Sequence, residues 1–152
     1  MRTAGSLMRP WRPTARRWQS ERSWPRTPPP NLPWQGALIT LQHSAGTVLL
    51  KHGDVDAARD IFSRALSHSQ QLSRDQPNEV SWHSLAAVSY ERIGSVQRLR
   101  NDPAGAATAY RSALASMQEV MRLAPSSGEA QKNLATIQQL IAEAEAETRR
   151  RP

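Results

Sequence analysis

The segment KHGDVDAARDIF, residues 51–62, has a histidine, a glycine and two aspartates within its first six positions. A histidine beside an aspartate can act as a general base, because the carboxylate orients the imidazole. The same residue types also suit a joint between two helices. A glycine can end one helix in the left-handed conformation, and an aspartate can cap the next helix. The rest of the sequence must therefore distinguish a catalytic pair from a turn.

The other residues that could do chemistry show no catalytic or metal-binding pattern. His43, His68 and His83 have neither metal-ligand spacing nor acidic partners at fixed helical offsets. The chain has no cysteine, which excludes disulfides, thiolate metal sites and cysteine nucleophiles. The GxSxG, glycine-rich phosphate-loop and HExxH motifs are absent. We therefore expect no enzymatic activity, no metal and no cofactor.

The net charge of +7 is concentrated at the two ends of the chain. Residues 1–32 hold seven arginines and a single acidic residue, and residues 149–152 add three more arginines. Because residues 1–32 are rich in Arg, Pro, Ser and Trp and poor in aliphatic residues, we predict that they are disordered. The interleaved tryptophans and arginines could contact nucleic acid or a membrane surface. We favour a solvated tail, an organellar targeting segment or a misplaced start codon.

From Pro33 onward the apolar residues recur at helical spacing. Two predicted faces are Ala106, Tyr110, Ala113, Met117 and Val120, and Ala130, Leu134, Ile137, Ile141 and Ala144. No segment alternates with the period of two that is typical of a strand. The pattern predicts five helices, at about 34–52, 55–75, 79–100, 103–124 and 127–148.

Several residues carry the signals of helix starts. Asp102 is expected to cap a helix that has Pro103 at its first position. The pair Ser126 and Glu129 has the spacing of a capping box. In the last helix the alternating Glu143, Glu145 and Glu147 point to different sides, which indicates a solvated face. These assignments make the chain from Pro33 onward all-helical.

A shift of the chain by 48 residues shows an internal repeat, which is typical of helical-repeat proteins. The identical pairs are Trp34/Trp82, Gly46/Gly94, Val48/Val96, Asp54/Asp102, Ala58/Ala106, Ala65/Ala113, Leu66/Leu114, Gln70/Gln118, Arg74/Arg122 and Pro77/Pro125. In the second copy the histidine is lost, whereas Asn101 replaces Gly53 and the capping aspartate remains. We therefore interpret the segment 51–62 as a turn between two helices.

The segments AGTVLLKHGDVDAARDIFSRAL (45–66) and IGSVQRLRNDPAGAATAYRSAL (93–114) resemble tetratricopeptide (TPR) repeats. That family has the motif W-x2-L-G-x2-Y followed by A-x3-F-x2-A. The matching residues are Gly46, Ala58, Phe62 and Ala65 in the first copy, and Tyr90, Gly94, Ala106, Tyr110 and Ala113 in the second. The resemblance implies that the glycine lets the two helices of a pair touch, and that the alanines leave room for the aromatic side chain.

The repeat of 48 residues is longer than the usual 34 of the family, by about four helical turns shared between two helices. It resembles the long-helix repeats found beside signalling domains in large bacterial proteins. The resemblance implies an all-α fold, a TPR-like α-solenoid of antiparallel helix pairs with about five helices. The domain 33–148 would contain the units 33–80 and 81–126 and a terminal helix at 127–148.

By resemblance, the first helix of each pair lines a groove that holds a peptide or helix of a partner protein. The groove candidates are His43, Thr47, Lys51, Glu91, Ser95 and Arg98. Alternatively, these are merely solvated helix positions. The expected function is a non-catalytic protein–protein interaction module. Two alternatives stay open: a nucleic-acid-associated protein that uses residues 1–32, and a C-terminal regulatory fragment of a larger bacterial signalling protein such as a Ser/Thr kinase.

The apolar residues also bear on location and assembly. No run reaches the length of a membrane-spanning helix, and residues 1–32 lack the apolar segment of a secretory signal. We expect a cytoplasmic protein without a membrane span. The first predicted helix carries an apolar face that nothing earlier in the array covers, so we expect self-association through it. Leu140 is expected on the uncovered side of the last helix.

Overall fold

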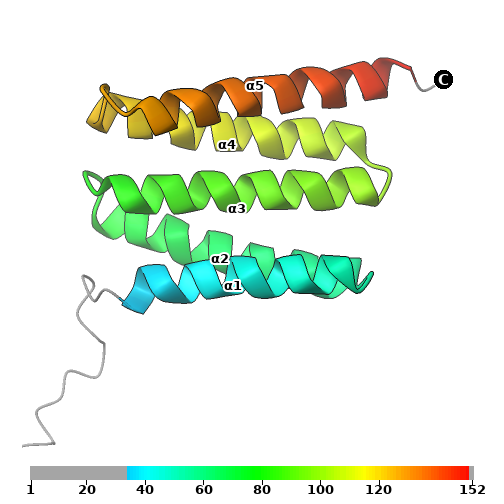
Figure 1. Ribbon diagram of the computed structural model, residues 1–152, viewed down its shortest axis with the longest axis horizontal. Helices are drawn as coiled ribbons and strands as arrows, with labels where there is room; N and C mark the ends of the chain where they lie inside the picture. Colours follow the sequence, from blue (N-terminus) through cyan, green and yellow to red (C-terminus); the bar gives the residue numbers. More distant parts are fainter. Residues whose placement is uncertain (1–33, 151–152) are drawn as a thin grey trace, which may run out of the picture.

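The computed structural model describes residues 34–150, and these form five α-helices without a strand. The helices are α1 (Trp34–Lys51), α2 (Val55–Asp75), α3 (Val80–Leu99), α4 (Pro103–Leu123) and α5 (Gly128–Arg149). Consecutive helices run antiparallel and pack on one another in a solenoid-like way, with α1, α3 and α5 in one layer and α2 and α4 behind them (Figure 1). The predicted all-α architecture of helix pairs is confirmed. The predicted disordered tail, residues 1–32, lies outside the described residues.

The helix starts follow the predicted caps with one exception. Oδ1 of Asp54 accepts a hydrogen bond from the Ala57 amide at 3.1 Å, and Oδ1 of Asp102 accepts one from Gly105 at 2.8 Å. The prediction that Ser126 caps the last helix is wrong. Ser127 takes this role, because α5 begins at Gly128 and the Ser127 hydroxyl accepts from the Ala130 amide at 3.2 Å.

The segment that opened the sequence analysis is a turn. Gly53 has a φ of 82° and its repeat equivalent Asn101 a φ of 66°, so both adopt the left-handed conformation between two helices. His52 donates a hydrogen bond from Nδ1 to the Val48 carbonyl at 2.9 Å, within the last turn of its own helix. His52 therefore belongs to a helix end, and Asp54 belongs to the cap of the next helix.

Each helix pair closes over a glycine that faces an aromatic ring. A Cβ atom added to Gly46 would lie 2.6 Å from Cζ of Phe62, and one added to Gly94 would lie 2.7 Å from Cδ1 of Tyr110. Both rings are almost fully buried. The flanking alanines of the motif, Ala58, Ala65, Ala106 and Ala113, have no exposed surface. The close approach that the family resemblance implied at the glycine and alanine positions is therefore present in both pairs.

The core continues from one pair to the next. Trp82 of α3 packs with Ile39, Ala65 and Leu72 of the first pair, while Val96 packs with Ala58 and Phe62. A larger cluster joins α4 and α5 and contains Tyr110, Met117, Val120, Ala130, Ile137 and Ala144. Leu140, expected on an uncovered face of the last helix, is partly buried and packs against this cluster. Each pair thus buries its apolar side on the preceding pair.

Candidate functional site

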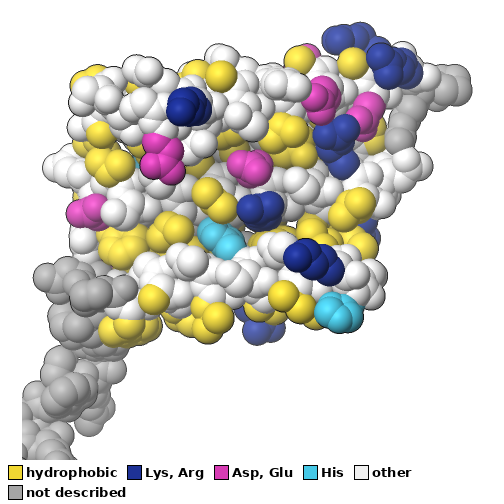
Figure 2. Space-filling view, viewed as in Figure 1, with side chains coloured by type: hydrophobic (Ala, Val, Ile, Leu, Met, Phe, Trp, Pro, Cys, Tyr) yellow, Lys and Arg dark blue, Asp and Glu magenta, His cyan; other side chains and the backbone are white. Residues whose placement is uncertain are grey.

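The layer of α1, α3 and α5 carries all six groove candidates (Figure 1). His43, Thr47 and Lys51 lie on α1, and Glu91, Ser95 and Arg98 lie on α3. On this face basic and acidic side chains are mixed over α3 and α5, and apolar side chains fill the spaces between the helices (Figure 2). The six side chains differ in how deeply they are buried and in the partners that they contact within the protein.

His43 is buried, so its assignment to an open groove is corrected. Its Nε2 lies 2.8 Å from Oγ of Ser89 on α3, and its ring lies 6.4 Å from that of Phe62 on α2. The Ser89 hydroxyl donates to the Leu85 carbonyl at 2.9 Å, so Nε2 of His43 is the donor to Ser89. His43 therefore connects three helices within the core.

Burial lowers the pKa of His43 below its usual 6.5, and the positive charge of Arg92 lowers it further. We expect the free energy of unfolding to fall as the pH drops below about 6.5, because unfolded His43 then binds a proton that the folded state resists. The slope of this fall should be at most about 1.4 kcal/mol per pH unit, because only one proton is involved. Below the folded-state pKa of His43 the unfolding free energy should no longer change through this group. Urea unfolding between pH 8 and 5 measures it.

The matched variant for this pH dependence is His43→Gln, which keeps an amide donor toward Ser89 and cannot titrate in this range. Its unfolding free energy should depend less steeply on pH than that of the unmodified chain. Equal slopes for the two proteins would show that the environment of His43 does not resist protonation.

Arg98 also has partners inside the protein. Its guanidinium pairs with Glu143 at 3.3 Å and with Glu147, so it joins α3 to α5. Glu145, on another side of α5, pairs with Arg111 of α4 at 2.6 Å. The alternating glutamates do point to different sides, but the expectation of a plain solvated face is wrong, since each one meets an arginine. Arg98 and Arg111 lie 34 or more positions from these glutamates, beyond the reach of local spacing, and Glu145 has a second, local partner in Arg149 at 4.0 Å.

The remaining candidates stay at the surface of the layer. Thr47 donates its hydroxyl to the His43 carbonyl at 2.9 Å, and Ser95 donates to the Glu91 carbonyl at 3.1 Å. These bonds stay within the same helix and leave the hydroxyl oxygens able to accept. Lys51 is exposed and Glu91 half-buried. The surface of the layer is therefore polar and mixed in charge, as predicted for the groove, but His43 is not part of it.

A hollow of about 580 Å³ opens between α3, α4 and α5. Its walls include Ser95, Arg98, Leu99, Tyr110, Leu140 and Glu147. Leu99 is an exposed large apolar residue beside the Arg98–Glu147 ion pair. Ser95 and Arg98 were predicted from the sequence as groove residues, whereas Tyr110, Leu140 and Glu147 were predicted in other roles. The hollow therefore offers an apolar side chain and charged groups close together.

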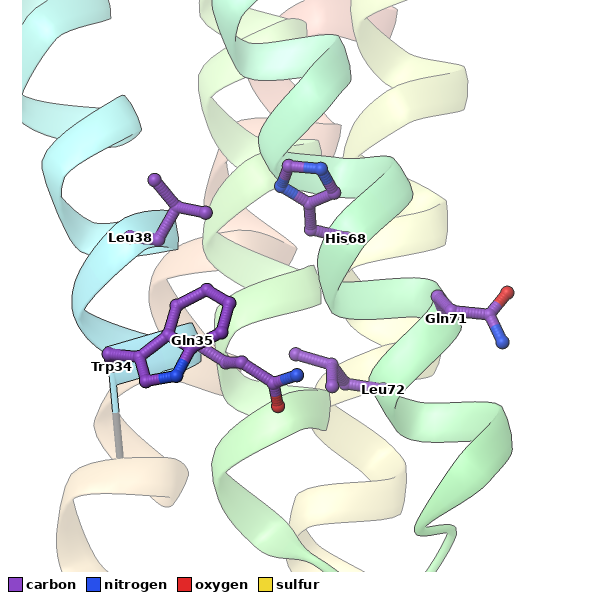
Figure 3. A pocket seen from close by; sticks show the side chains of 6 residues that line it. All are labelled: Trp34, Gln35, Leu38, His68, Gln71 and Leu72. Atoms are coloured by element: carbon purple, nitrogen blue, oxygen red, sulfur yellow. The ribbon is translucent and has the colours of Figure 1, made fainter. Parts of the chain in front are cut away.

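A smaller pocket, of about 180 Å³, lies between α1 and α2 at the N-terminal end of the array. Trp34, Gln35 and Leu38 come from α1, and His68 and Leu72 face them from α2 (Figure 3). Oε1 of Gln35 is buried without a hydrogen-bond partner. Sequence reasoning missed this pocket, although the apolar spacing of Trp34 and Leu38 was a signal for it.

The described residues hold no group of three His, Asp or Glu side chains placed to bind a metal ion. Within residues 34–150 no helix combines the length and apolar character needed to cross a membrane. Neither a family model nor a curated protein matches the sequence. The geometry of the layer of α1, α3 and α5 is therefore the basis for assigning a function.

Proposed function

We propose that the chain is a non-catalytic protein–protein interaction module of the tetratricopeptide type, which binds a peptide or helix of a partner on the layer of α1, α3 and α5. The observation that carries the proposal is the hollow of about 580 Å³ between α3, α4 and α5. It combines the exposed Leu99 with the Arg98–Glu147 ion pair. Binding sites for protein segments combine apolar anchors with polar groups that set orientation in this way.

The packing of the helix pairs supports the tetratricopeptide part of the proposal. In both pairs an aromatic ring lies directly over a helical glycine, at Gly46 and at Gly94. The alanines of the motif are buried around these rings. These contacts fill the roles that the motif residues of such repeats imply, in two successive pairs with the same register.

The chemistry of the hollow indicates the kind of segment it would hold. Leu99 and Leu140 can receive an apolar side chain, and Glu147 and Arg98 can hydrogen-bond polar groups of the peptide at the rim. Because Arg98 is already paired with Glu143 and Glu147, it is a poor clamp for a free carboxylate. We therefore propose an internal peptide segment or a helix with an apolar anchor, rather than a chain terminus.

Peptides that bind the chain can be selected from a random display library on the immobilised full chain. We expect these peptides to bind the Leu99→Asp variant about tenfold or more weakly than the unmodified chain. The reason is that burying a leucine-sized apolar contact contributes about 1.5–3 kcal/mol, and tenfold corresponds to about 1.4 kcal/mol. Fluorescence polarisation with labelled peptides measures the dissociation constants.

The matched control is Ser63→Asp, which adds the same charge at an exposed position of α2 in the opposite layer. It should bind the selected peptides as the unmodified chain does. Peptides that bind both variants equally well, or whose NMR shift changes map to α2 and not to the walls of the hollow, would contradict the proposed site.

A further inference from the structure

Each helix of the α1–α3–α5 layer carries the same stripe of five positions, spaced by four, three, four and three residues. The stripe is Trp34, Leu38, Leu41, Ala45 and Val48 on α1; Trp82, Ala86, Ser89, Ile93 and Val96 on α3; and Ala130, Leu134, Ile137, Ile141 and Ala144 on α5. Successive stripes are related by the 48-residue repeat. This spacing places all five side chains on one helix face, as in the seam of paired helices.

The stripe is the face by which a pair packs on the pair before it. On α3, Trp82 is 8% exposed and Val96 0%; on α5, Ile137 is 1% exposed and Ala144 0%. On α1 the same positions are open: Trp34 is 46% exposed, Leu41 65% and Val48 52%. Within residues 34–150 no helix precedes α1 to cover its stripe. The repeat thus identifies this apolar face as a packing surface that the described part of the chain leaves uncovered.

The opposite end of the array has a polar surface. The exposed residues of α5 include Gln131, Lys132, Gln138 and Gln139. Between Trp34 and Leu50, in contrast, α1 contains no Asp, Glu, Lys or Arg. A head-to-tail contact between copies would place the apolar stripe of α1 on the polar face of α5 and leave amide and ammonium groups without water. The two ends of the array are therefore poorly matched to one another.

We propose that the stripe of α1 binds the stripe of α1 in a second copy of this chain, in an antiparallel, two-fold symmetric contact centred on Leu41. In this register Trp34 of one copy lies opposite Val48 of the other, and Leu38 lies opposite the small residues Ser44 and Ala45. Large side chains thus meet smaller ones along the contact, and Leu41 meets its own copy. A two-fold contact of one surface with itself closes the assembly at two chains.

The neighbouring pocket fits the same arrangement. Its volume of about 180 Å³ lies beside Trp34 and Leu38, where the C-terminal half of the partner's α1 would be seated. Leu72 of α2 forms part of its wall and adds apolar surface next to the stripe. The docking surface therefore extends from α1 onto the edge of α2.

Sedimentation equilibrium of the full chain over a wide concentration range tests this proposal. We expect a reversible dimer, and we expect Leu41→Glu to shift the association to at least about tenfold higher concentration, because it buries two carboxylates at the centre of the contact. Ala135→Glu, a matched change at an exposed position of α5, should associate as the unmodified chain does. Circular dichroism of both variants checks that the helices are retained.

A single-cysteine variant tests the symmetry, because the chain has no cysteine of its own. Leu41→Cys should form a disulfide-linked dimer under mild oxidation, whereas Ala135→Cys should not. A strictly monomeric chain would overturn the proposal and would mean that something other than a second copy covers α1. Association that is lost in both Leu41→Glu and Ala135→Glu would indicate a head-to-tail contact of α1 on α5, and association that survives Leu41→Glu would exclude the α1 stripe; either result would overturn the proposal.

Discussion

Replacing Gly94 with leucine is expected to lower the free energy of unfolding by about 1–3 kcal/mol. An added Cβ would lie only 2.7 Å from Cδ1 and 2.8 Å from Cζ of Tyr110, whose ring is 1% exposed. Neither α3 nor the buried ring can move aside without disturbing the cluster that Tyr110 shares with Met117 and Ile137. Replacement of a helical glycine by a better helix former would by itself stabilise by roughly 0.5–1 kcal/mol, so overpacking outweighs propensity.

Alanine variants at two glycines provide the matched comparison for this prediction. Gly94→Ala should be less damaging than the leucine variant but still destabilising. Gly36→Ala, also within a helix, should be neutral or stabilising, because its Cβ would meet Trp82 at an ordinary 3.5 Å and Leu85 at 4.0 Å. Thermal and urea unfolding give the free energies. An unchanged or raised stability for Gly94→Ala would mean that the two helices of the pair do not touch there.

Replacing Ile137 with alanine is expected to lower the free energy of unfolding by about 2–5 kcal/mol. Ile137 occupies the middle of the α5 stripe, is 1% exposed and belongs to the cluster with Tyr110, Met117 and Val120. Truncation removes its apolar contacts and leaves a cavity between α4 and α5, because the surrounding helices can relax only in part. Urea unfolding monitored by circular dichroism measures the loss.

The repeat offers a control at the equivalent position of the first unit. Leu41→Ala truncates the same stripe where it is exposed, so in dilute solution it should change the unfolding free energy by only about 0.5 kcal/mol or less. Similar losses for the two variants would show that the faces of α1 and α5 are covered to the same extent. Such a result would argue against an open first helix.

The sequence by itself determined the features that depend on neighbours along the chain. The apolar period of the helices, the left-handed turn residues Gly53 and Asn101, and the capping aspartates Asp54 and Asp102 all act within a few positions, so the pattern predicts them directly. The 48-residue repeat extended this reach. It related the two helix pairs, and the family resemblance implied that Gly46 and Gly94 lie where helices touch, as the structure confirms.

The tertiary structure alone decided which polar residues meet. The sequence placed His43 on the groove layer, but the packing of α1 against α3 brings its ring to Ser89, 46 positions away. Tertiary packing likewise brings Arg98 to Glu143 and Glu147, which leaves less open polar surface than the spacing implied. Such contacts depend on the angle between successive pairs, which arises from packing over the whole core. The same packing buries the stripe on α3 and α5 and leaves it open on α1, although the repeat gives all three helices the same positions.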